Sequence, residues 1–474
     1  MSTNRFVRHN DKRPALIRKF VGDRRFYRRL MTIAVPIMIQ NVISNFVNLL
    51  DNIMVGQVGT EQMSGVAIVN QLIFVYYLCM FGGLSGVGIF TAQYYGQRDD
   101  EGIRHTFRFK LWMSAIITGS VFLVLLFFGR PIIGLFLNGD SSAGDVEAAL
   151  GYGLDYLSVI FFSMPAIMII QVYAMSLRDC SRTKLPMIAS IVSVLTNLVL
   201  DYILIFGKFG FPEMGVKGAA LATVIARFVE MSIIVIYSHS KRDEITWLKG
   251  MYKTLLVPWK YAKEFLKKGI PILVNEGLWS MGMSFLLQCY SLRGMEVVAA
   301  FNIANVIGNL LNQAFFAMGD AVAIIVGQLL GAEKMEEAKD TDTKILAFSF
   351  TSGIVVGGLL IIASFFFPNL YNTTPQVKDI AMHIILINAI FTPQVALLHS
   401  SYFTIRAGGR TIITFFFDSG FMIAASLPVA FILSRFTTLP VLMIYVVICL
   451  VETIKLVIGL TMVCKNIWIR KITV

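Results

Sequence analysis

The sequence predicts an all-α polytopic membrane protein, with twelve transmembrane helices in two pseudo-symmetric six-helix lobes. Hydrophobic residues make up 56% of the 474 residues and charged residues only 15%, whereas about 25% of the residues of a soluble globular protein are charged. Apolar runs of membrane-spanning length alternate with polar gaps, and the second half of the chain repeats the pattern of the first. The net charge of +12 is then a signal of membrane topology rather than of nucleic-acid binding.

Twelve apolar runs follow a polar, basic N-terminal segment. They lie near residues 30–54, 65–92, 111–129, 152–174, 185–206, 216–237, 266–291, 297–328, 345–367, 380–404, 411–433 and 440–463. Each is close to the roughly 20 residues that a transmembrane helix needs. The expected divisions are a basic cytoplasmic segment at 1–29, an N-lobe at 30–238, a cytoplasmic amphipathic linker at 239–265, a C-lobe at 266–464 and a cytoplasmic C-terminus at 465–474.

Lysine and arginine are distributed unevenly between alternate gaps. One set of gaps, together with both ends of the chain, holds 33 of them, whereas the other set holds six. The positive-inside rule then predicts a multi-pass protein of the cell membrane with both termini in the cytoplasm. The linker carries Trp247 and Trp259 among basic residues, which predicts a segment lying at the membrane interface. The five cysteines have neither disulfide nor zinc-site spacing.

The two halves of the chain resemble each other at nearly constant offsets. AVPIMIQN at 34–41 aligns with GIPILVNE at 269–276, an offset of 235. Further matched pairs are Gln93 with Gln328 and Gly96 with Gly331 at 235, and Arg178 with Arg406 and Arg227 with Lys455 at 228. Two repeats of six spans lie the same way up, related by an axis along the membrane normal, and the substrate path is expected between or within them.

Four polar residues lie within the apolar runs of the N-lobe, at a common depth in the outer half. They are Asp51 in the first run, Asn197 and Asp201 in the fifth, and Thr223 in the sixth. A carboxylate inside a span costs roughly 2.5–3.5 kcal/mol on insertion scales and usually serves ions, protons or substrates. All four side chains offer oxygen ligands that suit Na⁺, while two close carboxylates could instead share a proton. We therefore expect a cation or proton site here.

The C-lobe lacks the same acids, because Leu286 and Val429 occupy the repeat positions of Asp51 and Asp201. It has its own polar residues within the spans, and the first span of the N-lobe adds two asparagines. Candidates for substrate binding or a second-lobe site are Glu276, Asn41, Asn48, Asn302, Asn305 and Asp418. Pro36 and Pro271 occupy equivalent places in the first and seventh spans, where each can kink its helix and take part in a conformational change.

Four stretches resemble the multidrug and toxic compound extrusion (MATE) transporters. They are LLDNIMVGQVGTEQMSGVAI (49–68), NLVLDYILIFG (197–207), MGVKGAALATVIAR (214–227) and IPILVNEGLWSMGM (270–283). The resemblance covers nearly the whole chain. It implies twelve helices in two lobes, and cation- or proton-driven export of organic, often cationic, compounds.

The first lobe is similar to the DinF-type branch of that family. In that branch, an aspartate of span 1, an asparagine and an aspartate of span 5 and a threonine of span 6 form the site, and they match Asp51, Asn197, Asp201 and Thr223. Its bending proline matches Pro36.

The second lobe departs from the NorM-type branch. There, a glutamate of span 7 and an aspartate of span 10 form a second-lobe site. In this chain Glu276 stands about one helical turn closer to the proline, and Val395 lies near the place of the aspartate.

The function expected from the sequence is a secondary active efflux antiporter that exports organic, cationic compounds or drugs in exchange for Na⁺ or H⁺. The alternative is a flippase or exporter of an amphiphilic or lipid-linked substrate, which would need buried Arg or Lys for an anionic headgroup. No catalytic constellation such as H-E-x-x-H occurs, so we do not expect an enzyme. Expected partners are small organic cations or drugs and membrane lipid, with no nucleic acid, no cofactor beyond the coupling ion, and a monomeric state.

Overall fold

The computed structural model describes residue 14, residues 19–137 and residues 145–473, apart from the side chains of residues 47–49 and 52. Over these residues the chain is helical and contains no β-strand. The first half comprises α2 (Arg24–Gly56), α3 (Thr60–Gln97), α4 (Asp100–Leu137), α5 (Val146–Ile160), the 3₁₀ turn η1 (Phe161–Ser163), α6 (Met164–Asp179), α7 (Lys184–Ile205) and α8 (Gly215–Ser240).

Two 3₁₀ turns, η2 (Thr246–Leu248) and η3 (Met251–Lys253), lead to the second half. That half comprises α9 (Trp259–Ser291), α10 (Met295–Gly331), α11 (Met335–Phe366), the 3₁₀ turn η4 (Phe367–Leu370), α12 (Pro375–Ala407), α13 (Thr411–Phe415), the π-helical segments η5 (Phe416–Gly420) and η6 (Met422–Ser426), α14 (Leu427–Phe436) and α15 (Val441–Cys464).

Eleven of the described helical segments are long and apolar enough to cross a membrane. The run from α5 to α6 counts as one of them, and the run from α13 to α14 as another. The twelfth is α2, whose 33 residues span about 50 Å at 1.5 Å per residue. It begins at Arg24, six residues before the apolar run, where the Asp23 side chain caps it by accepting from the Phe26 N–H over 2.7 Å. The twelve-helix expectation is confirmed.

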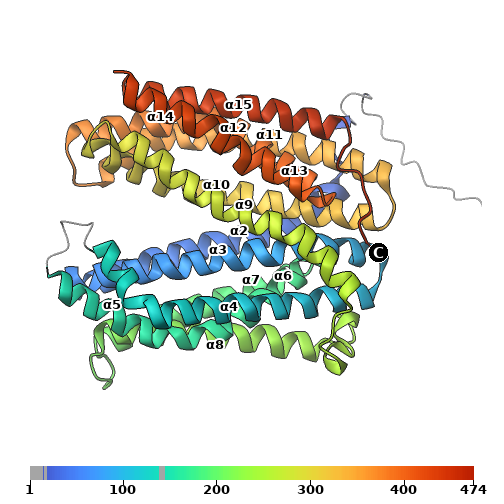
Figure 1. Ribbon diagram of the computed structural model, residues 1–474, viewed down its shortest axis with the longest axis horizontal. Coiled ribbons are helices and arrows are strands. Elements are labelled where there is room, and N and C mark those ends of the chain that lie inside the picture. The colour runs from blue at the N-terminus through green and yellow to red at the C-terminus, as the bar shows by residue number, and fades with distance from the viewer. Residues whose placement is uncertain (1–13, 15–18, 138–144, 474) are drawn as a thin grey trace, which may run out of the picture.

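The helices form two bundles that lie side by side (Figure 1). The N-lobe, from α2 to α8, is coloured blue to green and lies below the C-lobe, from α9 to α15, coloured yellow to red. Within the N-lobe α7 packs on α8 and α3 on α4, while in the C-lobe α10 and α11 both pack on α12. Each lobe therefore buries its own apolar core.

The first helix of each lobe also packs on the other lobe. Leu30 and Ile37 of α2 belong to a buried cluster formed mainly by the C-lobe. Reciprocally, the Phe265 ring of α9 lies 4.8 Å from the ring of Phe90 in α3 and 5.3 Å from that of Phe109 in α4. These contacts lie toward one end of the molecule, where α2 begins and residues 465–473 pack. We call it the inner end.

At the inner end, α3 and α10 cross with their backbones in contact. A Cβ added to Gly96 of α3 would lie 2.0 Å from the carbonyl oxygen of Gln328 in α10. A Cβ added to Gly331 of α10 would lie 2.0 Å from the carbonyl oxygen of Gln93 in α3. Only glycine permits this approach from either side. The contact is reciprocal because the two glycines and the two glutamines are repeat partners.

The same glutamines join the lobes by hydrogen bonds. Gln93 donates through Nε2 to the carbonyl of Ala407, at the end of α12, over 3.2 Å. Gln328 donates through Nε2 to the carbonyl of Asp179, at the end of α6, over 2.9 Å. The internal repeat thus reappears as a pseudo-twofold seam between the lobes.

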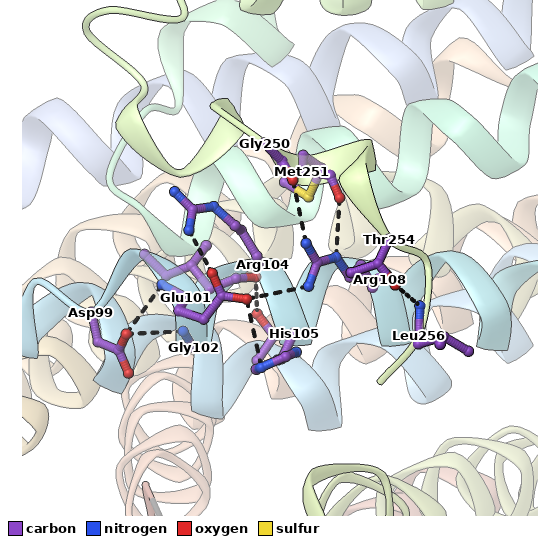
Figure 2. Close-up of polar contacts among 12 residues, drawn as sticks. Asp99, Glu101, Gly102, Arg104, His105, Arg108, Gly250, Met251, Thr254 and Leu256 are labelled. Atoms are coloured by element: carbon purple, nitrogen blue, oxygen red, sulfur yellow. Dashed lines mark hydrogen bonds and ion pairs between the residues drawn. The ribbon is translucent and has the colours of Figure 1, made fainter. Parts of the chain in front are cut away.

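The linker between the lobes is bound along α4. Figure 2 shows the Arg108 guanidinium at the carbonyls of Gly250 and Met251, with the Nε to Met251 distance at 3.0 Å. Arg104 Nε donates to the carbonyl of Trp247 over 3.2 Å. Trp247 is 2% exposed, so it packs inside the N-lobe rather than at a lipid interface. The linker can lie here because α4 supplies hydrogen-bond donors to its backbone carbonyls. Trp259 remains exposed.

Several basic residues counted as loop charges are buried inside helices. Lys110 of α4 is fully buried and Arg406 of α12 is 3% exposed. The ammonium of Lys110 lies 2.7 Å from Asp179 Oδ2, and this pairing offsets the cost of burying both charges. These basic groups contact other parts of the protein rather than lipid headgroups. The count of charges in the sequence could not distinguish these two cases.

Candidate functional site

The N-lobe buries two carboxyl groups close together. Asp51 lies near the end of α2 and Asp201 near the end of α7, and these two helices pack against each other. Asp201 is 1% exposed, and Asp51 is one of its electrostatic neighbours. Two buried carboxylates that interact in this way repel each other, and a proton or a bound cation relieves that repulsion.

The oxygens of this acid pair have few other partners. Neither oxygen of Asp201 nor Oδ1 of Asp51 accepts a hydrogen bond from an N–H or O–H donor among the described residues. Buried polar atoms are satisfied in the great majority of cases, so an exception requires an explanation such as an ion or a functional role. Three orphaned oxygens in one place make this acid pair a candidate site for a proton or a cation.

Amide and hydroxyl groups from three further helices surround the acid pair. Asn197 stands one turn before Asp201 on α7, and its Nδ2 donates to Thr223 Oγ1 of α8 over 3.4 Å. The Tyr156 hydroxyl of α5 donates to Asn70 Oδ1 of α3 over 3.2 Å. The four residues grouped by their depth in the sequence are brought together here.

A charged arginine stands beside the site but is already paired. Arg227 lies one turn beyond Thr223 on α8, and its Nη1 is 2.8 Å from Glu230 Oε2. Its guanidinium carbon is 6.0 Å from the centre of the Tyr77 ring. Among the described residues, no basic side chain comes within 4 Å of either aspartate of the pair. The acid pair therefore has no cation supplied by the described part of the chain.

Tyr156, Asn70 and Tyr77 are site residues that sequence reasoning missed. Asn70 is an amide inside the second apolar run, and it would have been found if every amide within an apolar run had been taken as a candidate site residue. Tyr156 is one of 16 tyrosines and gives no pattern of its own. Its role depends on how α5 packs beside α3 and α8.

The C-lobe site residue Glu276 lies in α9 near other charged residues of the C-lobe. Its electrostatic neighbours include Arg406 and Asp320. Arg406 stacks on Phe403 of its own lobe and Phe81 of the N-lobe, with its guanidinium carbon 5.2 and 5.7 Å from the ring centres. Its Nη1 has no hydrogen-bond partner within the described chain. Glu276 thus belongs to a polar region where the lobes meet.

Asp418 and Glu276 do not form an unpartnered pair of acids like Asp51 and Asp201, because both oxygens of Asp418 already have partners. Its Oδ1 is 2.7 Å from the ammonium of Lys455, and its Oδ2 accepts from Asn275 Nδ2 over 3.1 Å. Lys455 also lies near Glu452 of its own helix, but that distance is longer, at 3.4 Å to Oε2.

The remaining candidates are spread along α2, α9 and α10. Asn302 and Asn305 are exposed on α10, on the half away from the seam, and Asn41 is partly buried on α2. The side chain of Asn48 lies outside the described residues. Pro36 and Pro271 both stand inside continuous helices, α2 and α9. The structure does not gather these residues into one site.

Metal-ligand chemistry at the acid pair is restricted to oxygen. In the described segments, no three His, Cys, Asp or Glu side chains group as ligands for a metal ion. A hard cation at Asp51 and Asp201 would therefore draw on the amide and hydroxyl oxygens of Asn197, Thr223 and Tyr156. Such neutral oxygens are common ligands for hard cations.

Two repeated helical lobes that meet at a reciprocal seam, with a buried acid pair inside one lobe, are the architecture of a membrane transporter rather than of an enzyme. A family model described as MatE matches residues 36–203 and 271–432, which cover both lobes. The chain belongs to this family, the MATE transporters. It is a multi-pass membrane protein.

Curated relatives extend over most of the chain. It is 29% identical over 428 residues to the probable multidrug resistance protein NorM of Thermotoga maritima, covering 88% of this chain and 87% of the relative. It is 25% identical over 437 residues to the probable multidrug resistance protein YoeA of Bacillus subtilis, covering 89% of each. These relatives support multidrug efflux as the general function.

Solved structures share the fold. A structure described as the outward-facing conformation of a multidrug resistance MATE family transporter of the MOP superfamily matches with a TM-score of 0.82 and 20% identity, over 96% of this chain and 98% of that one. A crystal structure of MATE in the bent conformation matches with a TM-score of 0.81 and 19% identity, over 95% and 96%.

Proposed function

We propose that this transporter is a secondary active antiporter that exports organic cations or drugs in exchange for H⁺ or Na⁺. The coupling ion binds at Asp51 and Asp201, assisted by Asn197 and Thr223. The observation that carries the proposal is the buried acid pair with three orphaned oxygens. Burial of the two acids near each other favours a proton, because one proton relieves the repulsion between two carboxylates. Na⁺ is the alternative that the same oxygens suit.

Coupling follows from competition for negative charge. An ion that neutralises the acid pair removes the electrostatic attraction for a cationic substrate. A ligand shifts a conformational equilibrium only through different affinities for the two states, and the carboxyls can supply that difference. Bending of α2 at Pro36, which stands in the same helix as Asp51, would carry the change toward the inner end.

The topology proposed from the basic residues places the inner end in the cytoplasm. The seam at Gly96 and Gly331 is closed at that end, and the ribbons of the two lobes diverge toward the other (Figure 1). We infer that the structure represents an outward-facing state. Glu276, Asn302 and Asn305 are then proposed to contact the substrate, together with Asn41 and Asn48 of α2.

A second candidate function is supported by the buried arginines. Arg178 of α6 and its repeat partner Arg406 both lie in the polar region between the lobes, and each has a guanidinium nitrogen with no hydrogen-bond partner in the described chain. Such groups could hold the anionic headgroup of an amphiphilic or lipid-linked substrate. Asp179, Asp320 and Glu276 lie close enough to balance these charges, so export of cations remains favoured.

Transport in proteoliposomes tests the proposal. Export of a fluorescent organic cation is measured with a proton gradient and a sodium gradient imposed separately. Asp51→Asn and Asp201→Asn should each abolish gradient-driven export, while Asp155→Asn, which removes an exposed acid paired with Lys217, should not. Full gradient-driven export by both site variants would refute the assignment. Export of an anionic lipid analogue alone would favour the second candidate.

A further inference from the structure

The C-lobe buries an ammonium between two carboxylates. Lys455 of α15 is 3% exposed, and its Nζ is 2.7 Å from Asp418 Oδ1 and 3.4 Å from Glu452 Oε2. Each carboxylate keeps a neutral donor on its other oxygen: Asn275 Nδ2 at 3.1 Å on Asp418, and Ser426 Oγ at 2.6 Å on Glu452. A buried charge is tolerated only when it is paired and hydrogen-bonded, and this arrangement meets both conditions.

The backbone around this group is specialised. Asp418 lies in the π-helical segment η5, and Ser426 closes the second segment, η6. Asn275 of α9 inserts its side chain here, with Oδ1 accepting from the backbone N–H of Ser419 over 3.2 Å. A side chain that takes a backbone donor out of the ladder deforms a helix, and π-segments often lie at functional sites. The position of the Asp418 carboxylate therefore depends on this local deformation of the helix.

The N-lobe differs at the equivalent lysine position. Arg227 is the repeat partner of Lys455, but it pairs with Glu230 on its own helix. Asp51 and Asp201 are left without a basic partner among the described residues. The buried acids of the N-lobe thus have no basic side chain paired with them among the described residues, whereas those of the C-lobe are paired with Lys455.

We propose that Lys455 is a resident cation: its ammonium occupies the C-lobe acid site that an exchangeable ion would otherwise fill. Lys455 thereby sets the ion stoichiometry, because coupling ions exchange only in the N-lobe. The inference rests on the proposed function in one respect, the assignment of the coupling ion to Asp51 and Asp201. Without Lys455, Asp418 and Glu452 would stand together uncompensated, and such a site recruits a proton or Na⁺.

The first test counts bound cations on purified protein. Binding of ²²Na⁺ and uptake of protons are measured in the Asp51→Asn, Asp201→Asn background, which should bind no coupling ion. Adding Lys455→Met should restore about one cation per molecule, and adding Lys455→Arg should not. A folded Lys455→Met protein that gains neither Na⁺ nor a proton would overturn the proposal.

The second test does not depend on the folding of a variant with unpaired charges. Lys455→Met, Asp418→Asn and Glu452→Gln are combined, since replacing a whole buried ion group is tolerated better than removing one partner. The ratio of ions to substrate transported should equal that of the wild type. A lower ratio would overturn the proposal by showing that Asp418 or Glu452 carries a coupling ion. If the Asp51→Asn, Asp201→Asn protein still exchanges ions, the proposed function fails separately.

Discussion

The backbone contact at the seam makes a sharp prediction for Gly96→Ala. The new Cβ would lie 2.0 Å from the Gln328 carbonyl, whereas an ordinary contact begins at 3.4 Å. The neighbour is helix backbone, which cannot rotate away as a side chain can, so α3 and α10 must separate by about 1.4 Å at this point. Overpacking of this kind costs roughly 1–3 kcal/mol.

That cost applies only while the seam is closed. At about 2 kcal/mol, the ratio of inner-closed to inner-open protein should fall roughly 30-fold, since 1.4 kcal/mol is tenfold. Gly331→Ala should act alike, because its Cβ would meet the Gln93 carbonyl at the same distance.

Spin-label distances across the inner end provide the measurement. In a cysteine-free background, Asp243→Cys on the linker and Glu336→Cys at the start of α11 give exposed label sites. The ratio of the inner-open to the inner-closed distance population should rise roughly 30-fold in Gly96→Ala. Gly119→Ala and Gly358→Ala are matched controls, because their Cβ atoms would meet nothing within 4 Å. The same distance distribution in Gly96→Ala and in the controls would refute the reasoning.

Three further changes separate the roles of individual residues. Glu276→Gln should alter substrate range or turnover in uptake assays with several organic cations while ion dependence is kept; loss of all ion dependence would move the coupling site to the C-lobe. Tyr156→Phe removes a hydrogen bond of about 1 kcal/mol and should shift the coupling-ion concentration for half-maximal transport about fivefold, with an unchanged value counting against its place in the site. Pro36→Ala should leave ion binding intact in equilibrium titrations but slow turnover, and an unchanged turnover rate would exclude bending at this proline as a limiting step.

The sequence was most informative about position along the membrane normal. Helix direction and a fixed rise per residue set the depth of Asp51, Asn197, Asp201 and Thr223, and the structure brings these four together. Lateral packing was not predictable in the same way. The approach of Tyr156 depends on how α5 lies beside α3 and α8, and no spacing along the chain encodes that contact.

Charges were harder to interpret than apolar runs. A lysine at the end of an apolar run gives the same sequence signal whether it faces lipid headgroups or a buried carboxylate. Lys110 proved to be fully buried beside Asp179. Asp418 and Lys455 come from different helices, so their 2.7 Å contact lay beyond any rule based on i to i+4 spacing. The insertion of the Asn275 side chain beside the π-helical segment also could not be predicted from the sequence, because it depends on how α9 packs in three dimensions.

The repeat is symmetric where the lobes touch and asymmetric where charge is handled. At the seam, Gln93 and Gln328 each donate an equivalent hydrogen bond to a backbone carbonyl of the opposite lobe, so rocking about this crossing strains both lobes alike. Within the lobes, Leu286 and Val429 replace the acid pair, and Lys455 fills the acids that the C-lobe has. A ligand can drive a symmetric hinge only through unequal affinity for its two states. If exchangeable ions bind in one lobe only, a single binding event shifts the equilibrium of the whole rocking motion. No second ion site then has to be filled at the same time.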